Sequence, residues 1–183
     1  MPVSLAGTCP TLPITEATLE RLFAAKYRRF QAGRSKYWVT IMERLLEDAL
    51  MYWESKRLGR KMPARRDLDP LLEVPRMTPW IVLTDVLHDP LDFRFRLIGS
   101  GVVDMSRANH TGKLFSEMPR FGPGNYLWTP RAEVVKTGTP LRSEPPYVGR
   151  VRTVRGVAEI HLPLSDDDTT VNMIFSVVVF DSA

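Results

Sequence analysis

The C-terminal run "VNMIFSVVVF" (171–180) is the sequence feature that most constrains the fold. Apolar residues occupy both of its alternation sets: one set includes Phe175 and Val177, and the other includes Ile174 and Val178. Because successive side chains of a strand point to opposite faces, a strand that is apolar on both sets must be covered on both faces. The sequence therefore predicts a sheet with one cover on each side. The short helices of 101–138 would form one cover and a helix of 36–58 the other.

That second cover is a long amphipathic helix, predicted from about Lys36 to Leu58 and ended by Gly59. Charged residues lie mainly off its apolar stripe. The stripe consists of Trp38, Ile41, Met42, Leu45, Ala49, Tyr52 and Trp53. An earlier helix is predicted at about 15–31, with Thr15 as its N-terminal cap.

A basic stretch follows the long helix, with six Lys or Arg residues between Lys56 and Arg66. Its first cations complement the negative end of the helix dipole. Asp69 and Pro70 have the chemistry of a cap for a short helical turn. The alternative is nucleic-acid binding through phosphate contacts, but no aromatic residues interleave the basic ones. We interpret the stretch as a joint between helix and sheet and expect no nucleic-acid partner.

Five strand-like runs follow position 79. The first two, 80–87 and 93–99, are close enough to form a hairpin, with Phe93, Phe95 and Leu97 predicted on one face. Short helices are expected within 101–138, including 113–118 and 125–137. The last three runs are 141–152, 156–164 and 171–180. This order predicts an α+β domain built on a five-stranded antiparallel sheet.

Composition and length agree with such a domain. The 183 residues are 44% hydrophobic and 25% charged, enough for a core and unlike a disordered chain. We divide the chain into a leader with an extra helix (1–35), the long helix with its joint (36–75), and the sheet domain (76–183). No apolar run reaches the roughly 18 residues of a membrane span, so we expect a cytoplasmic protein with no membrane partner. The single cysteine, Cys9, excludes an internal disulfide.

Several short motifs occur in the order found in a PAS-like family that is common in alphaproteobacteria. They are Trp53 and Arg57, Met62-Pro63, "RRDLDP" (65–70), "LTDV" (83–86), "DFRFRLIG" (92–99), "TGKLF" (111–115), "LPL" (162–164) and Val171-Asn172. The chain from about Trp53 to Phe180 thus resembles this family. It departs where Gly99-Ser100-Gly101 replaces the usual Gly-Thr. The resemblance implies a PAS-like sheet with short helices on one face, which can enclose a small molecule, and it implies no particular ligand.

The cofactors of well-known PAS domains do not fit this sequence. Flavin photochemistry and a covalent cinnamoyl chromophore both need a cysteine beside the pocket, and Cys9 lies far upstream. Haem needs an axial ligand, usually His, and the helix of 125–137 has none. His88, His110, His161 and the run Asp166–Asp168 show no metal-ligand spacing, so we expect solvated or capping roles for them. No cofactor and no metal are predicted.

Two sets of residues are the candidates for function. The predicted ligand pocket is an apolar region with a few polar groups, formed by Met105, Asn109, His110, Phe115, Tyr126 and Trp128. The predicted interface of a homodimer is part of the helix stripe, formed by Trp38, Met42, Leu45, Ala49 and Trp53.

The leading hypothesis is a stand-alone sensory or adaptor module in bacterial signalling. It would bind a small ligand or a protein partner and pass the signal to another chain. The alternative is a cone-like α+β enzyme resembling ketosteroid isomerase, for which Asp104 would be the buried acid. No nucleophile motif or phosphate loop supports catalysis, so we expect a non-enzymatic protein.

Overall fold

The structure is a computed structural model that describes residues 36–119 and 121–182, with side chains from residue 43 onward. The predicted helix at about 15–31, the rest of the leader and Cys9 lie outside these residues. Within the described part, the helix α2 (Lys36–Ser55), the joint and the sheet belong to one compact unit.

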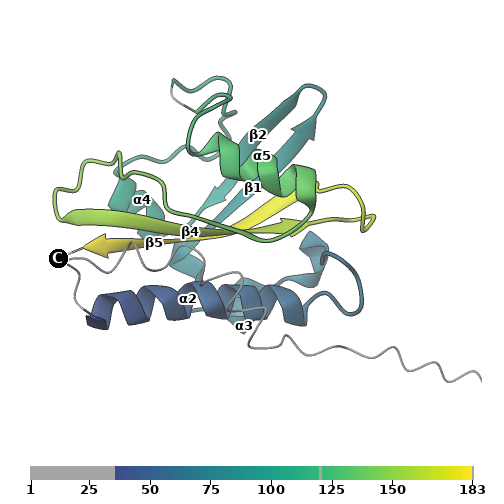
Figure 1. Cartoon of the computed structure of the whole chain (residues 1–183), viewed down its shortest axis with the longest axis horizontal. Helices are drawn as coiled ribbons and strands as arrows, with labels where there is room; N and C mark the ends of the chain where they lie inside the picture. Colours follow the sequence, from purple (N-terminus) through teal and green to yellow (C-terminus); the bar gives the residue numbers. More distant parts are fainter. Residues whose placement is uncertain (1–35, 120, 183) are drawn as a thin grey trace, which may run out of the picture. The chain divides into compact units, whose positions relative to one another are not determined.

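The described elements form an α+β fold, which confirms the predicted class (Figure 1). The helices are α2 (Lys36–Ser55), α3 (Pro70–Glu73), α4 (Ser100–Ser106) and α5 (Trp128–Thr137), with 3-10 turns η2 (Arg65–Asp67) and η3 (Thr78–Trp80). The strands are β1 (Ile81–His88), β2 (Leu91–Ile98), β3 (Leu141–Ser143), β4 (Val154–Leu164) and β5 (Met173–Ser182). They form one antiparallel sheet of order β2-β1-β5-β4-β3.

Strand β5 lies at the centre of the sheet, between β1 and β4. Helix α2 packs under β4 and β5, while α4 and α5 pack on the opposite face (Figure 1). Every residue from Met173 to Val179 is buried as a result. Each large aliphatic or aromatic side chain buried in this way contributes about 1.5–3 kcal/mol. The cover predicted for both faces of this strand is therefore present.

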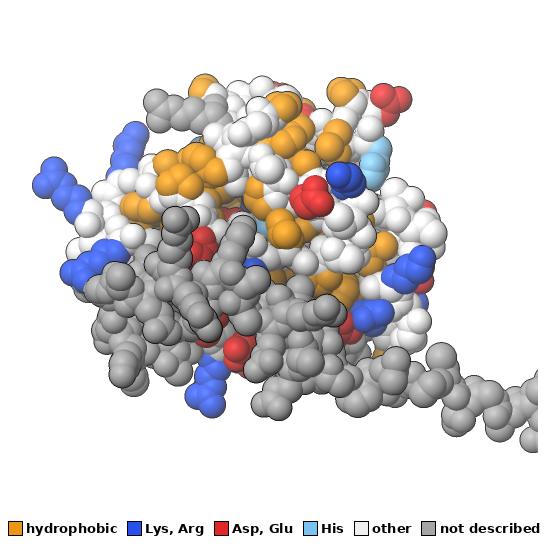
Figure 2. Space-filling model, in the orientation of Figure 1, with side chains coloured by type: hydrophobic (Ala, Val, Ile, Leu, Met, Phe, Trp, Pro, Cys, Tyr) orange, Lys and Arg blue, Asp and Glu red, His pale blue; other side chains and the backbone are white. Residues whose placement is uncertain are grey.

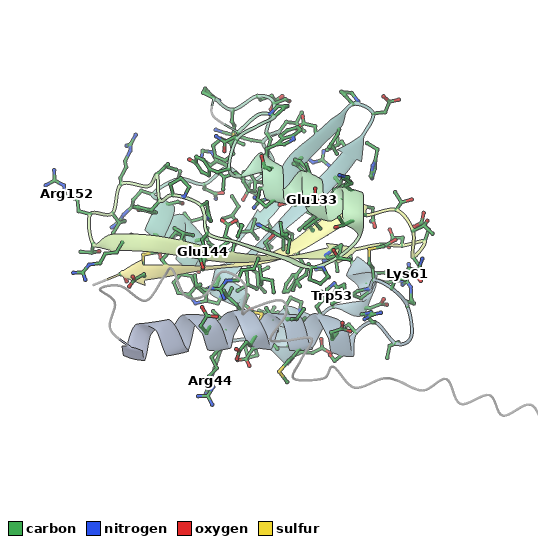
Figure 3. The ribbon with its side chains drawn as sticks, viewed as in Figure 1. Arg44, Trp53, Lys61, Glu133, Glu144 and Arg152 are labelled. Atoms are coloured by element: carbon green, nitrogen blue, oxygen red, sulfur yellow. The ribbon has the colours of Figure 1, made fainter. Side chains whose placement is uncertain are left out.

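Trp53 attaches α2 to the sheet. Its indole N–H donates a hydrogen bond of 2.7 Å to the Pro163 carbonyl, and its side chain is 2% exposed. Figure 3 shows Trp53 pointing from α2 toward the sheet and Arg44 pointing away from it. Nearer the start of the helix, Arg142 of β3 donates to both carboxylate oxygens of Glu43 at 2.6 Å.

This packing corrects part of the predicted dimer interface. Ala49 and Trp53 are buried within the chain, against the sheet, so they cannot form an exposed surface. Leu45 is half-buried, and the side chains of Trp38 and Met42 lie outside the described set. An amphipathic stripe does not reveal whether its partner is the same chain or a second copy. Here the sheet covers it, and self-association stays a prediction.

The joint holds the end of α2 against the β4–β5 turn. Ser165 donates its backbone N–H to the Pro63 carbonyl (2.9 Å), and Arg60 donates to the Ser165 carbonyl (2.7 Å). The Met62 amide donates to the Asp168 carboxylate at 3.0 Å. Helix α2 ends at Ser55, three residues before the predicted boundary, and Leu58 and Gly59 then adopt positive φ.

Acidic side chains lie within 4.0 Å of four of the six basic residues of the joint, which are Lys56, Arg57, Arg60 and Arg66. Lys56 pairs with Glu73, and Arg60 lies 3.5 Å from Asp67. The predicted cap is formed as well, because Asp69 accepts a hydrogen bond from the Leu72 amide at 3.4 Å. On the face shown in Figure 2, Lys and Arg side chains are scattered among acidic ones and do not form one continuous patch.

Two predicted elements were wrong in extent. Residues 113–118 are not helical: the Phe115 amide bonds to the Phe93 carbonyl, and Leu114 bridges Arg94 beside the sheet edge. Of the predicted strand 141–152, only Leu141–Ser143 pairs with β4. The two consecutive prolines at 145 and 146 cannot donate to a strand ladder, so the chain leaves the sheet there.

Leu97 does not share a face with Phe93 and Phe95 as predicted. The register shifts between Leu83 and Thr84, so Thr84 pairs with Phe95 while Leu83 pairs with Leu97. This bulge places an extra residue in β2 and reverses the alternation beyond it. Leu97 is consequently 43% exposed on the side of the sheet opposite to the cavity described next.

Candidate functional site

A cavity of about 560 Å³ lies between the sheet and the helical side of the domain. Its apolar wall combines strand residues with residues from the loops around α4 and α5. These are Val82, Phe95, Ile98, Val102, Phe121, Leu127, Val157, Val178 and Phe180. The volume falls within the range of roughly 300–1,000 Å³ that is usual for small-molecule sites.

The loop of residues 145–150 forms another wall of the cavity. Tyr147 holds this loop to α4, since its hydroxyl donates to the Met105 carbonyl at 2.5 Å. The same hydroxyl accepts from the Val151 amide at 2.9 Å. Pro145 and Pro146 restrict the backbone just before it. One tyrosine thus fixes a segment that has no partner strand of its own.

The polar groups of the cavity wall include a buried pair, Arg131 of α5 and Glu159 of β4. Their side chains are 3% and 6% exposed, and Arg131 Nη1 lies 4.0 Å from Glu159 Oε2. Nη1 donates a hydrogen bond to the Leu127 carbonyl at 2.7 Å. The guanidinium also lies over the Phe115 ring, 5.4 Å from its centroid. Burial lowers the pKa of Arg131 and Glu159 opposes this, but an arginine remains charged at any ordinary pH.

His161 is fully buried beside this pair, so the solvated or capping role predicted for it was wrong. Both of its ring nitrogens have partners: Nδ1 is 2.9 Å from Ser176 Oγ, and Nε2 is 3.0 Å from Ser143 Oγ. Nε2 is also 3.1 Å from Glu159 Oε2. Burial, together with the charge of Arg131, lowers the pKa of His161 and leaves the imidazole neutral at pH 7.

Glu159 is ionised in this environment. Burial by itself raises the pKa of a carboxyl group, but contact with His161 and the charge of Arg131 outweigh that effect. The pKa of Glu159 therefore lies below its ordinary value. The cavity wall thus carries a fixed guanidinium and a fixed carboxylate.

His110 lines the cavity from the loop after α4. Its ring lies 6.3 Å from Phe95 in a stacked arrangement and 5.5 Å from Phe121 in an edge arrangement. Burial lowers the pKa of His110, and the nearby Lys113 lowers it further. Its Nδ1 is buried and has no hydrogen-bond partner among the described residues.

Of the six residues predicted to line a pocket, His110 and Tyr126 line this cavity. Phe115 and Trp128 instead fill the aromatic core behind it, with the Phe93 ring 5.5 Å and 4.9 Å from theirs. Asn109 is exposed and accepts from the Thr111 amide at 3.0 Å. Met105 contributes its carbonyl to Tyr147, as described above.

Asp104 is exposed on α4 and does not line the cavity, so it is not the buried acid that an isomerase-like site would need. The residues that sequence reasoning missed are Arg131, Glu159 and Tyr147. A signal was present for Glu159, which interrupts an apolar strand at a position where a charged side chain must find a partner.

The other candidate ligands have local structural roles. His88 Nε2 lies 2.9 Å from the Val171 carbonyl, and Asp167 accepts hydrogen bonds from the Thr169 and Thr170 amides. Within the described residues, no three His, Cys, Asp or Glu side chains gather as a metal site would require. No helix in this part of the chain is both long and apolar enough to cross a membrane.

Comparison with known proteins shows a similarity to one family over part of the chain. Residues 42–124 match the family model described as "PAS domain". A search of curated proteins gives no match. The matched range runs from α2 through the joint, β1, β2 and α4 into the segment between α4 and α5, and it ends before Arg131 and Glu159. The match over these residues and the five-stranded antiparallel sheet both support a similarity of this chain to the PAS domain family.

Proposed function

We propose that this chain is a PAS-like sensory or adaptor module that binds a small organic molecule in the cavity between the sheet and α4–α5. The observation that carries the proposal is the cavity itself, whose mainly apolar wall includes the buried pair Arg131 and Glu159. Ligand sites usually combine an apolar lining with a few well-placed polar groups of this kind.

Strand β5 provides a route by which binding would reach α2. Val178 lines the cavity, whereas its neighbours Val177 and Val179 alternate to the face that α2 covers. A ligand that favours one position of β5 would change how α2 packs, and this would shift the population of α2 arrangements. A partner protein would read that change at α2.

Binding is favoured over catalysis by the state of the buried carboxyl group. A general acid or base that works at neutral pH needs a pKa near 7. The pKa of Glu159 lies below its ordinary value, and Glu159 is already paired with Arg131. Glu159 is therefore suited to hold charge in place and not to exchange protons.

Filling the cavity tests the proposal. Ala108 lines it and is half-buried in the loop after α4, so Ala108→Phe adds volume at the cavity without removing a core side chain. We expect a library of small organic acids, amides and heterocycles to contain compounds that raise the melting temperature of the unchanged chain. The same compounds should have no effect on Ala108→Phe.

The matched control is Glu133→Phe, which places the same ring on the exposed side of α5 away from the cavity lining (Figure 3). It should respond to ligands as the unchanged chain does. Stabilisation that persists in Ala108→Phe would place the binding site elsewhere and contradict the proposal.

A further inference from the structure

Arg131 has more hydrogen-bond donors than the described residues satisfy. A guanidinium carries five N–H groups in a fixed fork. Nη1 donates to the Leu127 carbonyl at 2.7 Å, but the buried Nε has no acceptor in the described part of the chain. Glu159 does not accept a hydrogen bond from Arg131, because the 4.0 Å between Nη1 and Glu159 Oε2 is beyond hydrogen-bonding distance. A donor left unpaired in a site that is 2% exposed is costly unless something else supplies the acceptor.

The charges around the cavity favour an anion as that acceptor. Arg107 and Arg150 also line the cavity, at exposed positions, so three guanidinium groups share it with one carboxylate. Glu159 is the single acidic residue among the described lining residues. The excess positive charge attracts anions toward the opening and disfavours cations inside.

The remaining lining residues indicate which kind of molecule carries the anionic group. Around the polar pair the wall is formed by aromatic and aliphatic side chains, including Phe95, Phe121 and Val178. A small, fully hydrated ion would leave this surface uncovered. An apolar ring or chain in the ligand would cover this apolar surface and remove it from water. The gain in binding free energy is proportional to the apolar area covered.

We infer that the cavity is built for an organic anion, a carboxylate carried on an apolar ring or chain, and that Arg131 binds the carboxylate. The inference rests on the proposed ligand-binding function and specifies the chemical class of the ligand. The carboxylate would accept from the guanidinium of Arg131, which lines the cavity. Hydrogen bonds between guanidinium and carboxylate are stronger than those between neutral groups because both partners are charged.

Two probes of nearly the same shape distinguish the contribution of the ligand's charge to affinity from the contribution of its apolar contacts. 4-Phenylbutyrate and 4-phenylbutanamide differ only in whether the head group is a carboxylate or an amide. Isothermal titration of the full chain at pH 7 and low salt should show the carboxylate binding at least about tenfold more tightly than the amide. This comparison uses the unchanged protein and does not depend on the folding of any variant.

Substitutions then test the residue assigned. In Arg131→Met the preference should disappear, with amide affinity within about threefold of the original, since the apolar wall is retained. Arg131→Lys keeps the charge but loses the guanidinium fork, so its preference should be intermediate. Arg131→Lys also provides the test of this residue if Arg131→Met does not fold. The matched control is Arg152→Met, which removes an exposed arginine that projects away from the domain and does not line the cavity (Figure 3).

The outcomes separate this inference from the proposed function. Equal affinity for the two probes would overturn the anion inference, mark Arg131 as a purely structural arginine and leave the ligand-binding function standing. A tenfold preference that survives both Arg131 variants would overturn the role given to this residue. Failure of both probes, together with failure of the whole compound library, would contradict the inference and the proposed function alike.

Discussion

Burial determines the charge state and the hydrogen bonding of individual side chains in this domain. Arg131 and Glu159 would be an ordinary surface ion pair in water, worth at most about 1 kcal/mol. Removed from solvent beside a cavity, each keeps a fixed charge that a ligand can meet. His161 shows the opposite effect, because burial and the charge of Arg131 lower its pKa and keep it neutral. Its contacts with Ser143 and Ser176 make it a fixed hydrogen-bonding group.

Glu73 permits a pH prediction. It accepts hydrogen bonds from Lys56 and from the Tyr52 hydroxyl, and these contacts lower its pKa from 4.5 to about 2. A carboxyl whose pKa is lower in the folded chain stabilises it above the unfolded pKa and loses this effect as pH falls. Glu73→Gln should therefore lower the melting temperature at pH 7, and the difference should shrink between pH 4.5 and pH 2.

Thermal melting of the two proteins across this range provides the measurement. Glu133→Gln, an exposed change on α5, is the control and should melt like the unchanged chain at each pH. A Glu73→Gln difference that stays constant down to pH 2 would show that the lowered pKa does not stabilise the joint.

Among the elements, those that repeat a simple period over many residues were predictable. The apolar stripe of α2 and the double alternation of β5 identified both elements and the two-sided cover. The bulge in β2 and the bridge at Leu114 were not predictable, because each depends on a backbone pairing with a neighbouring strand and leaves no periodic signal.

The candidate site was predictable only in part for a related reason. His110 and Tyr126 stand in a recognisably aromatic region, but Arg131 and Glu159 become a pair only when α5 packs on β4.

The attachment of α2 to the sheet includes one buried hydrogen bond that a single substitution can remove. Trp53→Phe keeps most of the ring but leaves the Pro163 carbonyl without its donor. We expect a loss of about 1–3 kcal/mol in the free energy of unfolding, measured by urea denaturation at an unchanged m value.

Met51→Ala on the same helix is the control for that measurement. Its side chain is 57% exposed, so the change should stay within about 0.5 kcal/mol. An equal effect of the two substitutions would mean that the indole hydrogen bond does not hold α2 in place.

At the scale of the whole molecule, the sheet lies between the cavity on one face and α2 on the other. The side of the sheet that faces the cavity and the side that faces α2 share β5, the central strand of the sheet (Figure 1). Every residue of β5 from Met173 to Val179 is buried. The joint fixes α2 at one end through Ser165 and Asp168, and Arg142 ties β3 to the helix through Glu43. A change in the cavity thus has a continuous packed path to the surface where a partner would bind.

Native mass spectrometry of the chain purified from its own host tests the central claim most directly. We predict that the chain carries a retained small organic molecule whose mass adds to that of the polypeptide. The added mass should be absent from Ala108→Phe and present in Glu133→Phe. The bare polypeptide mass in every preparation, under desolvation gentle enough to preserve noncovalent complexes, would contradict the proposal that this protein is a ligand-binding sensor.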